Sequence, residues 1–325
     1  MVKRERYIDI AKGVGILLMI FGHTMGTINK LHIWIYSFHM PLFFIIGGIL
    51  MYEKFQDEKY SVGRSIGKEL GKMGFPYLFW GCVLIVFYTA LNIVSHQPLQ
   101  LSSRIVRLIS LRGIDSLWFL PAYFLSMSLF KLTKKNLPSR IVIAAFAICG
   151  IFLFRNINEP YMDVPYKVLL GYIFIMSGYY MKAFNFDQIG NDKIWLNIIL
   201  FLLGLDLAFL NGPVEMTVGS LGNPVLFLIC AMITSLCVVR LSKRLENKST
   251  AIIDGIIYYG KNSMILLVTN NLIIECIRLL DFKLTGNLLL KSGFIGSVIF
   301  TVMILLIEWV IIKHSNGRLS VLFGK

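Results

Sequence analysis

Long apolar segments, repeated along the whole chain, constrain this sequence more than any other feature. A segment of about 20 apolar residues is long enough to cross the hydrocarbon core of a bilayer as a helix. The predicted segments are residues 7–27, 33–52, 73–94, 115–132, 140–154, 166–183, 193–210, 222–240, 255–277 and 292–313. Only helices and closed barrels satisfy all their backbone groups within a bilayer. The sequence therefore predicts an all-α fold, a polytopic transmembrane bundle of about ten spans.

The composition agrees with a membrane protein and argues against several soluble classes. Hydrophobic residues make up 56% of the chain and charged residues only 15%, whereas a soluble domain carries about 25% charged residues. The net charge of +14 would suggest a nucleic-acid partner in a soluble protein, but the basic residues lie mostly in short loops, so none is expected. The five cysteines all fall inside apolar segments without metal-ligand spacing, so no metal site is expected.

The basic residues of the loops predict the orientation of the bundle. Lysine and arginine concentrate in the loops on the side of the two termini, which places both termini in the cytoplasm by the positive-inside rule. Arg104, Arg107 and Arg112 are exceptions in the largest outer loop, where they would suit an anionic acceptor or lipid phosphates. Because long polar insertions are absent, residues 1–325 are expected to form a single transmembrane domain with no soluble appended domain.

Polar residues interrupt the first apolar segment along one face. Lys12 and His23 lie eleven positions apart, so they project from nearly the same side of a helix, roughly 16 Å apart along its axis. Asp9 shares this face, and glycines such as Gly13 and Gly22 would let other helices approach closely. A charged residue inside a span usually marks a pathway or a site. The alternative is that Asp9 and Lys12 only pair with each other near the cytoplasmic surface.

The second span adds another histidine at a similar depth. His39 lies in the stretch YSFHMPLFF, and the predicted topology brings it into the outer third of the membrane, level with His23. Pro41 is expected to loosen the helix nearby, as happens where backbone lines a cavity. The two histidines could therefore form a polar pocket, although a single buried histidine is as often a packing residue.

Later polar residues give weaker signals. Asp115 and Trp118 lie at an outer boundary, where a tryptophan also fits an ordinary aromatic belt. Glu275 and Arg278 are three positions apart in one span and can pair with each other. Glu308 is isolated in the last span, and the sequence offers no partner for it.

A basic helical edge follows the second span on the cytoplasmic side. Arg64, Lys68 and Lys72 have i, i+4 spacing, so they can share one face and hold the phosphates of a nucleotide. The same residues are also what any cytoplasmic loop would carry. No HExxH, GxxxxGK[ST] or GxGxxG motif is present, so metalloprotease, P-loop and dinucleotide chemistry lose their usual support.

Several of these stretches together resemble a known family. RYIDIAKGVGILLMIFGHT followed by IYSFHMPLFFIIGGIL closely resembles the opening of the acyltransferase-3 family of integral membrane acyltransferases. The fucose 4-O-acetylase-like bacterial proteins are the most similar branch. The later stretches FPYLFWG, SLWFLPAYF, IFIMSGYYM and YGKNSMILL agree with this resemblance. It therefore covers essentially the whole chain.

The resemblance implies about ten helices and the transfer of acyl groups, usually acetyl from acetyl-CoA, to glycans at the far side of the membrane. Lys12 and His23 match the family's Arg/Lys-x10-His signature, and His39 matches the histidine of its FHMPLFF-like motif. The family's Arg-x-x-Arg element has no strict match, and the basic residues at 64, 68 and 72 are the nearest substitutes. Asn270 stands where many members carry a histidine, and no catalytic role is predicted for it.

These observations predict an O-acetyltransferase of a bacterial plasma membrane. Acetyl would pass from cytoplasmic acetyl-CoA to a hydroxyl of an extracytoplasmic or lipid-linked glycan, such as capsule, O-antigen, teichoic acid or secreted polysaccharide. The predicted catalytic residues are His23 as general base, Lys12 and His39. Arg64, Lys68 and Lys72 would bind the donor, and Asp9, Asp115 and Trp118 the acceptor. The alternative is a transporter or permease for a small polar solute, since buried ionisable residues also form relays.

Overall fold

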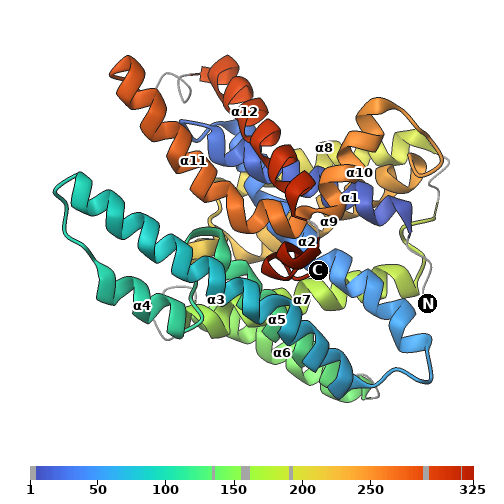
Figure 1. Cartoon of the computed structure of the whole chain (residues 1–325). Helices are drawn as coiled ribbons and strands as arrows, with labels where there is room; N and C mark the ends of the chain where they lie inside the picture. Colours follow the sequence, from blue (N-terminus) through green and yellow to red (C-terminus); the bar gives the residue numbers. More distant parts are fainter. Residues whose placement is uncertain (1–4, 134–135, 155–161, 190–192, 288–292, 316) are drawn as a thin grey trace. The chain divides into compact units, whose positions relative to one another are not determined.

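The computed structural model describes residues 5–133, 136–154, 162–189, 193–287, 293–315 and 317–325 (Figure 1). Helices make up nearly all of this part of the chain, and its only β-type pairing is an isolated bridge between Glu215 and Ser220. The expected all-α fold is therefore confirmed.

Helices occupy every predicted span. Among the described residues, seven helices are long and apolar enough to cross a membrane: α1 (Arg6–Thr24), α2 (Lys30–Gln56), α3 (Val62–Val94), α8 (Ile194–Asn211), α9 (Pro224–Arg244), α11 (Ser263–Thr285) and α12 (Gly293–His314). The predicted spans from 115 to 183 correspond to α5 (Phe119–Leu132), α6 (Leu137–Phe154) and α7 (Asp163–Ala183). The shorter helices are α4 (Leu101–Ile109), α10 (Ala251–Lys261) and the 3-10 turns Asp115–Trp118, Met216–Val218 and Gly317–Phe323. The chain is thus a polytopic helical membrane protein.

Two predicted spans differ from the helices of the structure. The ninth predicted span is not one helix, because α10 stops and α11 begins on either side of Asn262. The Asn262 side chain donates to the carbonyl of Tyr258 at 2.8 Å, a local bond of the kind by which asparagine competes with helix continuation. The third span begins earlier than predicted, at Val62, since a hydropathy pattern cannot detect a polar extension of a helix. Position 292, the predicted start of the last span, lies outside the described residues.

The described chain divides into two compact units. The first comprises Met1–Tyr60 and Ser126–Ser263, and in it α2 packs against α1, α7, α8 and α9 while α10 packs against α1. The second comprises Ser61–Leu125 and Met264–Lys325, and in it α3 packs against α4 and the C-terminal 3-10 turn. The expectation of a single functional domain stays a prediction.

Glycines set the closest helix contact of α1. A Cβ atom added at Gly13 would overlap the carbonyl oxygen of Ile256 on α10, and one added at Gly260 on α10 would overlap the carbonyl oxygen of Asp9. Small residues allow two helix backbones to approach in this way inside a membrane. One edge of α1 is therefore buried within the first unit, as the glycines of the first segment predict.

Candidate active site

The candidate site forms where α1 ends and α2 begins. The last turn of α1 carries His23, and α2 starts only six residues beyond its end, at Lys30. Asn29 caps α2, because its side-chain oxygen accepts a hydrogen bond from the His32 amide at 2.9 Å. Such a cap satisfies one of the donors that a helix start leaves without an intrahelical partner. The short connection holds the end of α1 beside the first turns of α2.

Three histidines surround one tyrosine at this position. The Tyr36 hydroxyl lies 3.1 Å from Nδ1 of His23. The ring of His32 stacks on the Tyr36 ring, with centroids 3.9 Å apart and planes 19° apart. His39 meets the same ring edge to face, with centroids 4.9 Å apart. We call His23, His32, Tyr36 and His39 the histidine–tyrosine cluster.

His39 is the most buried histidine of the cluster. Its side chain is almost inaccessible, and its Nδ1 lies 2.9 Å from the carbonyl oxygen of Ile35. A carbonyl can only accept, so Nδ1 of His39 donates and its Nε2 keeps the lone pair when the ring is neutral. His39 also interacts electrostatically with His23 and His32. The structure thus brings His23 and His39 together, while their catalytic roles stay predictions.

Sequence reasoning missed the other members of this site. His32, Tyr36 and His39 are spaced i, i+4 and i+7 on α2, a stripe that helical periodicity could have revealed. Glu215 interacts electrostatically with His32 and Tyr36. It lies in the turn between α8 and α9, where its backbone pairs with Ser220. No local pattern in the sequence signals its approach to α2.

Lys12 and Asp9 lie further along α1, away from this cluster. Asp9 is buried, with 3% of its surface exposed, and Lys12 is half-buried. The backbone of Asp9 lies against Gly260 of α10, and both Asp9 and Lys12 interact with other residues. The expected burial is confirmed for Asp9, whereas the roles of Lys12 in catalysis and of Asp9 in acceptor binding stay predictions.

The predicted acceptor residues Asp115 and Trp118 belong to the second unit. Asp115 accepts a hydrogen bond from the Tyr88 hydroxyl and adopts a left-handed backbone conformation, with φ at 49°. Such a conformation is uncommon outside glycine and often occurs at functional sites. Burial raises the pKa of the Asp115 carboxyl above its ordinary range. Trp118 is buried and meets Phe119 edge to face, so it is not an exposed belt residue.

The predicted donor residues also lie in the second unit. Arg64, Lys68 and Lys72 are all exposed and all lie on the continuous helix α3. Their i, i+4 spacing therefore places them along one face of a real helix rather than in a loop. Their role in donor binding stays a prediction. Asn270, which stands where many family members carry a histidine, is fully buried on α11.

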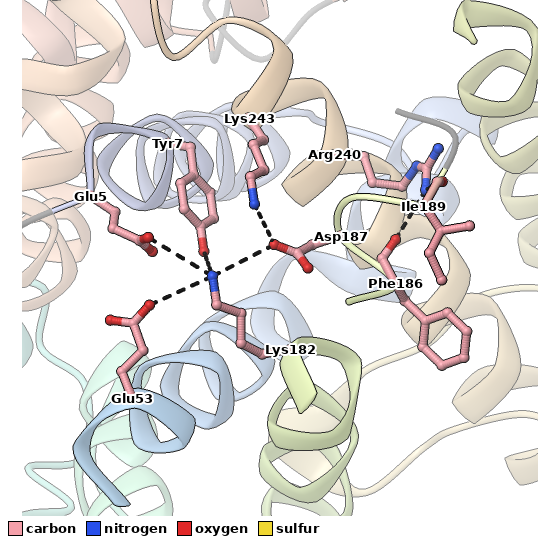
Figure 2. Close-up of polar contacts among 9 residues, drawn as sticks. All are labelled: Glu5, Tyr7, Glu53, Lys182, Phe186, Asp187, Ile189, Arg240 and Lys243. Carbon is pink, nitrogen blue, oxygen red and sulfur yellow. Dashed lines mark hydrogen bonds and ion pairs between the residues drawn. The ribbon is translucent and has the colours of Figure 1, made fainter. Parts of the chain in front are cut away.

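A second polar cluster lies at the other end of α1, where several helices of the first unit meet (Figure 2). The Lys182 ammonium, at the end of α7, lies 3.8 Å from Glu5, 3.6 Å from Glu53 and 3.7 Å from Asp187. It also donates to the Tyr7 hydroxyl at 3.3 Å. Lys243 reaches the same Asp187 at 2.8 Å. We call these residues the Lys182 cluster.

The Lys182 cluster shows the relative directions of four helices of the first unit. The start of α1 meets the ends of α2, α7 and α9, which contribute Tyr7, Glu53, Lys182 and Lys243. This is the alternation that the predicted spans require, whichever side of the membrane the chain begins on, and the cytoplasmic position of the termini stays a prediction. The histidine–tyrosine cluster therefore lies at the opposite end, toward the outer side of the predicted topology.

The side chains of the histidine–tyrosine cluster are suited to proton transfer. Imidazole is the side chain whose ordinary titration range lies closest to neutral pH, which suits a general base. Among the described residues, no group of three or more histidine, cysteine, aspartate or glutamate side chains has the geometry to hold a metal ion.

Comparison with known proteins assigns a chemistry to this scaffold. Residues 5–313 match a family model described as an acyltransferase domain. The chain is 31% identical over 220 residues to nodulation protein NolL of Mesorhizobium japonicum, covering 63% of this chain and 54% of that protein. It is 30% identical over 161 residues to nodulation protein NolL of Sinorhizobium fredii, covering 45% of this chain and 41% of that protein. The chain thus spans about half the length of these relatives, and no solved structure matches it.

Proposed function

Because the chain belongs to the acyltransferase-3 family, we propose that it transfers an acetyl group from cytoplasmic acetyl-CoA to a hydroxyl of an extracytoplasmic or lipid-linked glycan. The family and the candidate spans make it a membrane O-acyltransferase. The proposal adds the donor, the acceptor and the base, and it places the enzyme in a bacterial plasma membrane.

The histidine–tyrosine cluster is the observation that supports this proposal most. His23 lies in the last turn of a span, next to a tyrosine and near two further histidines. Placing polar side chains inside a span costs free energy, so a cluster of them marks a site more often than a packing detail. The half-buried position of His23 combines access for substrate with partial exclusion of water.

The reaction needs one base that later acts as an acid. His23 takes the proton from the acceptor hydroxyl as its oxygen attacks the thioester carbonyl. The carbon–sulfur bond then breaks, and the imidazolium returns the proton to the departing CoA thiolate. The products are the acetyl ester and free CoA, so no proton is gained or lost. An acetyl-histidine intermediate is the mechanistic alternative.

The remaining predicted residues would bind the two substrates. Arg64, Lys68 and Lys72 on α3 present exposed cations suited to the phosphates of CoA. The pantetheine arm would pass Lys12, which is also one of the predicted catalytic residues. Asp9, Asp115 and Trp118 would take part in acceptor binding, for which capsule, O-antigen, teichoic acid and secreted polysaccharide are the candidate glycans.

Transfer of labelled acetyl by the purified full chain in lipid nanodiscs tests the role of His23. His23→Ala should lower turnover by about 10²- to 10⁴-fold, the usual contribution of a general base. His314→Ala is the matched control, since His314 is exposed at the end of α12. Lys12→Ala and His39→Ala should also lower turnover. Wild-type turnover in His23→Ala would exclude His23 as the base.

Calorimetry with acetyl-CoA separates the enzyme from the transporter alternative. Saturable binding of acetyl-CoA, with acetate failing to bind and desulfo-CoA as the second control, would support the proposed donor. If the folded protein does not bind acetyl-CoA and instead accumulates a solute in vesicles without any acyl donor, the proposed function is wrong.

A further inference from the structure

Tyr36 lies at the centre of the candidate site, in contact with all three histidines of the cluster. Its ring is stacked on His32 and lies edge-on to His39, and its hydroxyl meets Nδ1 of His23. Gly22 allows this approach, because a Cβ atom there would lie 2.9 Å from the Tyr36 ring. The residue before His23 is therefore kept small where the tyrosine packs against α1.

The contact with Nδ1 bears directly on which ring nitrogen of His23 can act as a base. A neutral imidazole carries its proton on one nitrogen and a lone pair on the other, and only the nitrogen with the lone pair accepts a proton. If Nδ1 carries the proton, it donates to the Tyr36 oxygen and Nε2 is the basic atom. If Tyr36 donates instead, Nε2 carries the proton and cannot be the base.

We infer that Tyr36 is a positioning residue whose hydroxyl oxygen accepts the Nδ1–H of His23, so that Nε2 is the basic atom of that ring. This inference rests on the proposed function, because it assigns Tyr36 to the base of that reaction. His39 shows the same arrangement, since the Ile35 carbonyl holds the proton on its Nδ1.

The bond also strengthens as the reaction proceeds. When His23 takes the acceptor's proton, the ring becomes an imidazolium and its Nδ1–H···O bond to Tyr36 becomes charge-assisted. An interaction that is stronger in the transition state than in the ground state accelerates the chemical step. Tyr36 therefore acts on kcat more than on the KM for either substrate.

Nitrogen-15 NMR of histidine-labelled full chain in nanodiscs tests the inference without any need for turnover. The chain has five histidines, and the His23 signals are identified by their loss in His23→Gln. At alkaline pH the wild type should show a protonated Nδ1 and an unprotonated Nε2. In Tyr36→Phe, which keeps the ring but removes the hydroxyl, the population should shift toward the tautomer protonated at Nε2.

Kinetics provide the second measurement. Tyr36→Phe should lower kcat roughly ten- to hundredfold, as expected for the loss of one hydrogen bond to a charged group, with both KM values unchanged. Tyr52→Phe is the matched control, because Tyr52 lies on the same helix and contacts Tyr179 instead. It should change neither the His23 tautomer nor kcat.

The outcomes separate this inference from the proposed function. A protonated Nε2 in the wild type, or an unchanged tautomer in Tyr36→Phe, would overturn the role of Tyr36 even if the protein transfers acetyl. The expected tautomer in a protein that transfers no acetyl would uphold the positioning contact and reject the acetyltransferase proposal alone. If Tyr36→Phe fails to fold, the wild-type spectrum still decides.

Discussion

The backbone of Gly178 on α7 lies directly against the backbone of Ile45 on α2, and a Cβ atom at Gly178 would overlap the Ile45 carbonyl. The relationship is reciprocal, because Gly48 on α2 lies in the same way against Ile175 on α7. Two helices that meet through glycines can bring their backbones into contact. This close pair lies in the first unit, in which Glu53 on α2 also meets Lys182 on α7.

We expect alanine at either glycine to destabilise the protein. Gly48→Ala and Gly178→Ala insert a methyl group where the neighbour is rigid backbone, and overpacking of this kind costs about 1–3 kcal/mol or more. Gly67→Ala on α3 is the control, since nothing lies within 4 Å of its added Cβ and alanine favours a helix. Thermal melting in detergent should show lower midpoints only for the first two variants. Equal midpoints for all three would contradict the close contact.

The Lys182 cluster predicts a loss of stability when one cation is removed. Lys182→Met removes the cation that Glu5, Glu53 and Asp187 share, and it leaves the fully buried Asp187 with Lys243 as its cation. The cost should stay below the roughly 3–5 kcal/mol typical of breaking a buried ion pair, because Lys243 still pairs with Asp187 and the side chains of Glu5 and Glu53 are partly exposed. Unfolding in detergent should still occur at a lower denaturant concentration than for the wild type.

Two further variants make this prediction specific. Lys248→Met removes an exposed lysine and should leave stability unchanged. Adding Glu53→Gln to Lys182→Met removes one of the stranded charges and should recover part of the loss. A Lys182→Met protein as stable as the wild type would show that the cluster contributes nothing to folding.

The basic edge of α3 predicts a salt-dependent donor affinity. Changing Arg64, Lys68 and Lys72 together to alanine should weaken acetyl-CoA binding by about tenfold, since an exposed ion pair contributes only about 0.2–1 kcal/mol and three of them are lost. The affinity of the wild type should fall as salt is added, because these side chains are exposed. Calorimetry at low and high ionic strength measures both effects. Unchanged affinity in the triple variant would exclude this edge as the donor site.

We expect the free energy of unfolding to depend on pH through the carboxyl group of Asp115. Burial raises the pKa of its carboxyl in the folded state, so the folded protein holds this proton at pH values where the unfolded chain has lost it. The free energy of unfolding should therefore fall as pH rises from the ordinary carboxyl pKa through the raised pKa. Asp115→Asn keeps an acceptor for the Tyr88 hydroxyl and cannot ionise.

Unfolding of the wild type and of Asp115→Asn, compared from acidic to neutral pH, measures this effect. The variant should gain stability relative to the wild type as pH rises, and the two should converge in acid. A constant difference across that range would show that the Asp115 carboxyl does not carry the raised pKa.

Much of the fold and part of the site could be predicted from local patterns. Apolar segments became helices because a helix satisfies its backbone hydrogen bonds within one segment. The spacing of Glu275 and Arg278 predicted their ion pair, which forms at 2.6 Å. The alternation of spans predicted that His23 and His39 would lie at the same end of neighbouring helices. The family was also recognisable, because its motifs are contiguous stretches of sequence.

Only the tertiary structure decided which faces of the helices pack against each other. Glu308 had no evident partner in the sequence, yet it accepts a hydrogen bond from Thr269 at 2.7 Å across 39 positions. Glu53 on α2 pairs with Lys182 on α7, and Tyr36 on α2 contacts His23 on α1. Helix formation depends on hydrogen bonds between residues four apart and is therefore encoded locally. Contacts between helices depend on how remote side chains and glycines pack, and no single segment of the sequence contains that information.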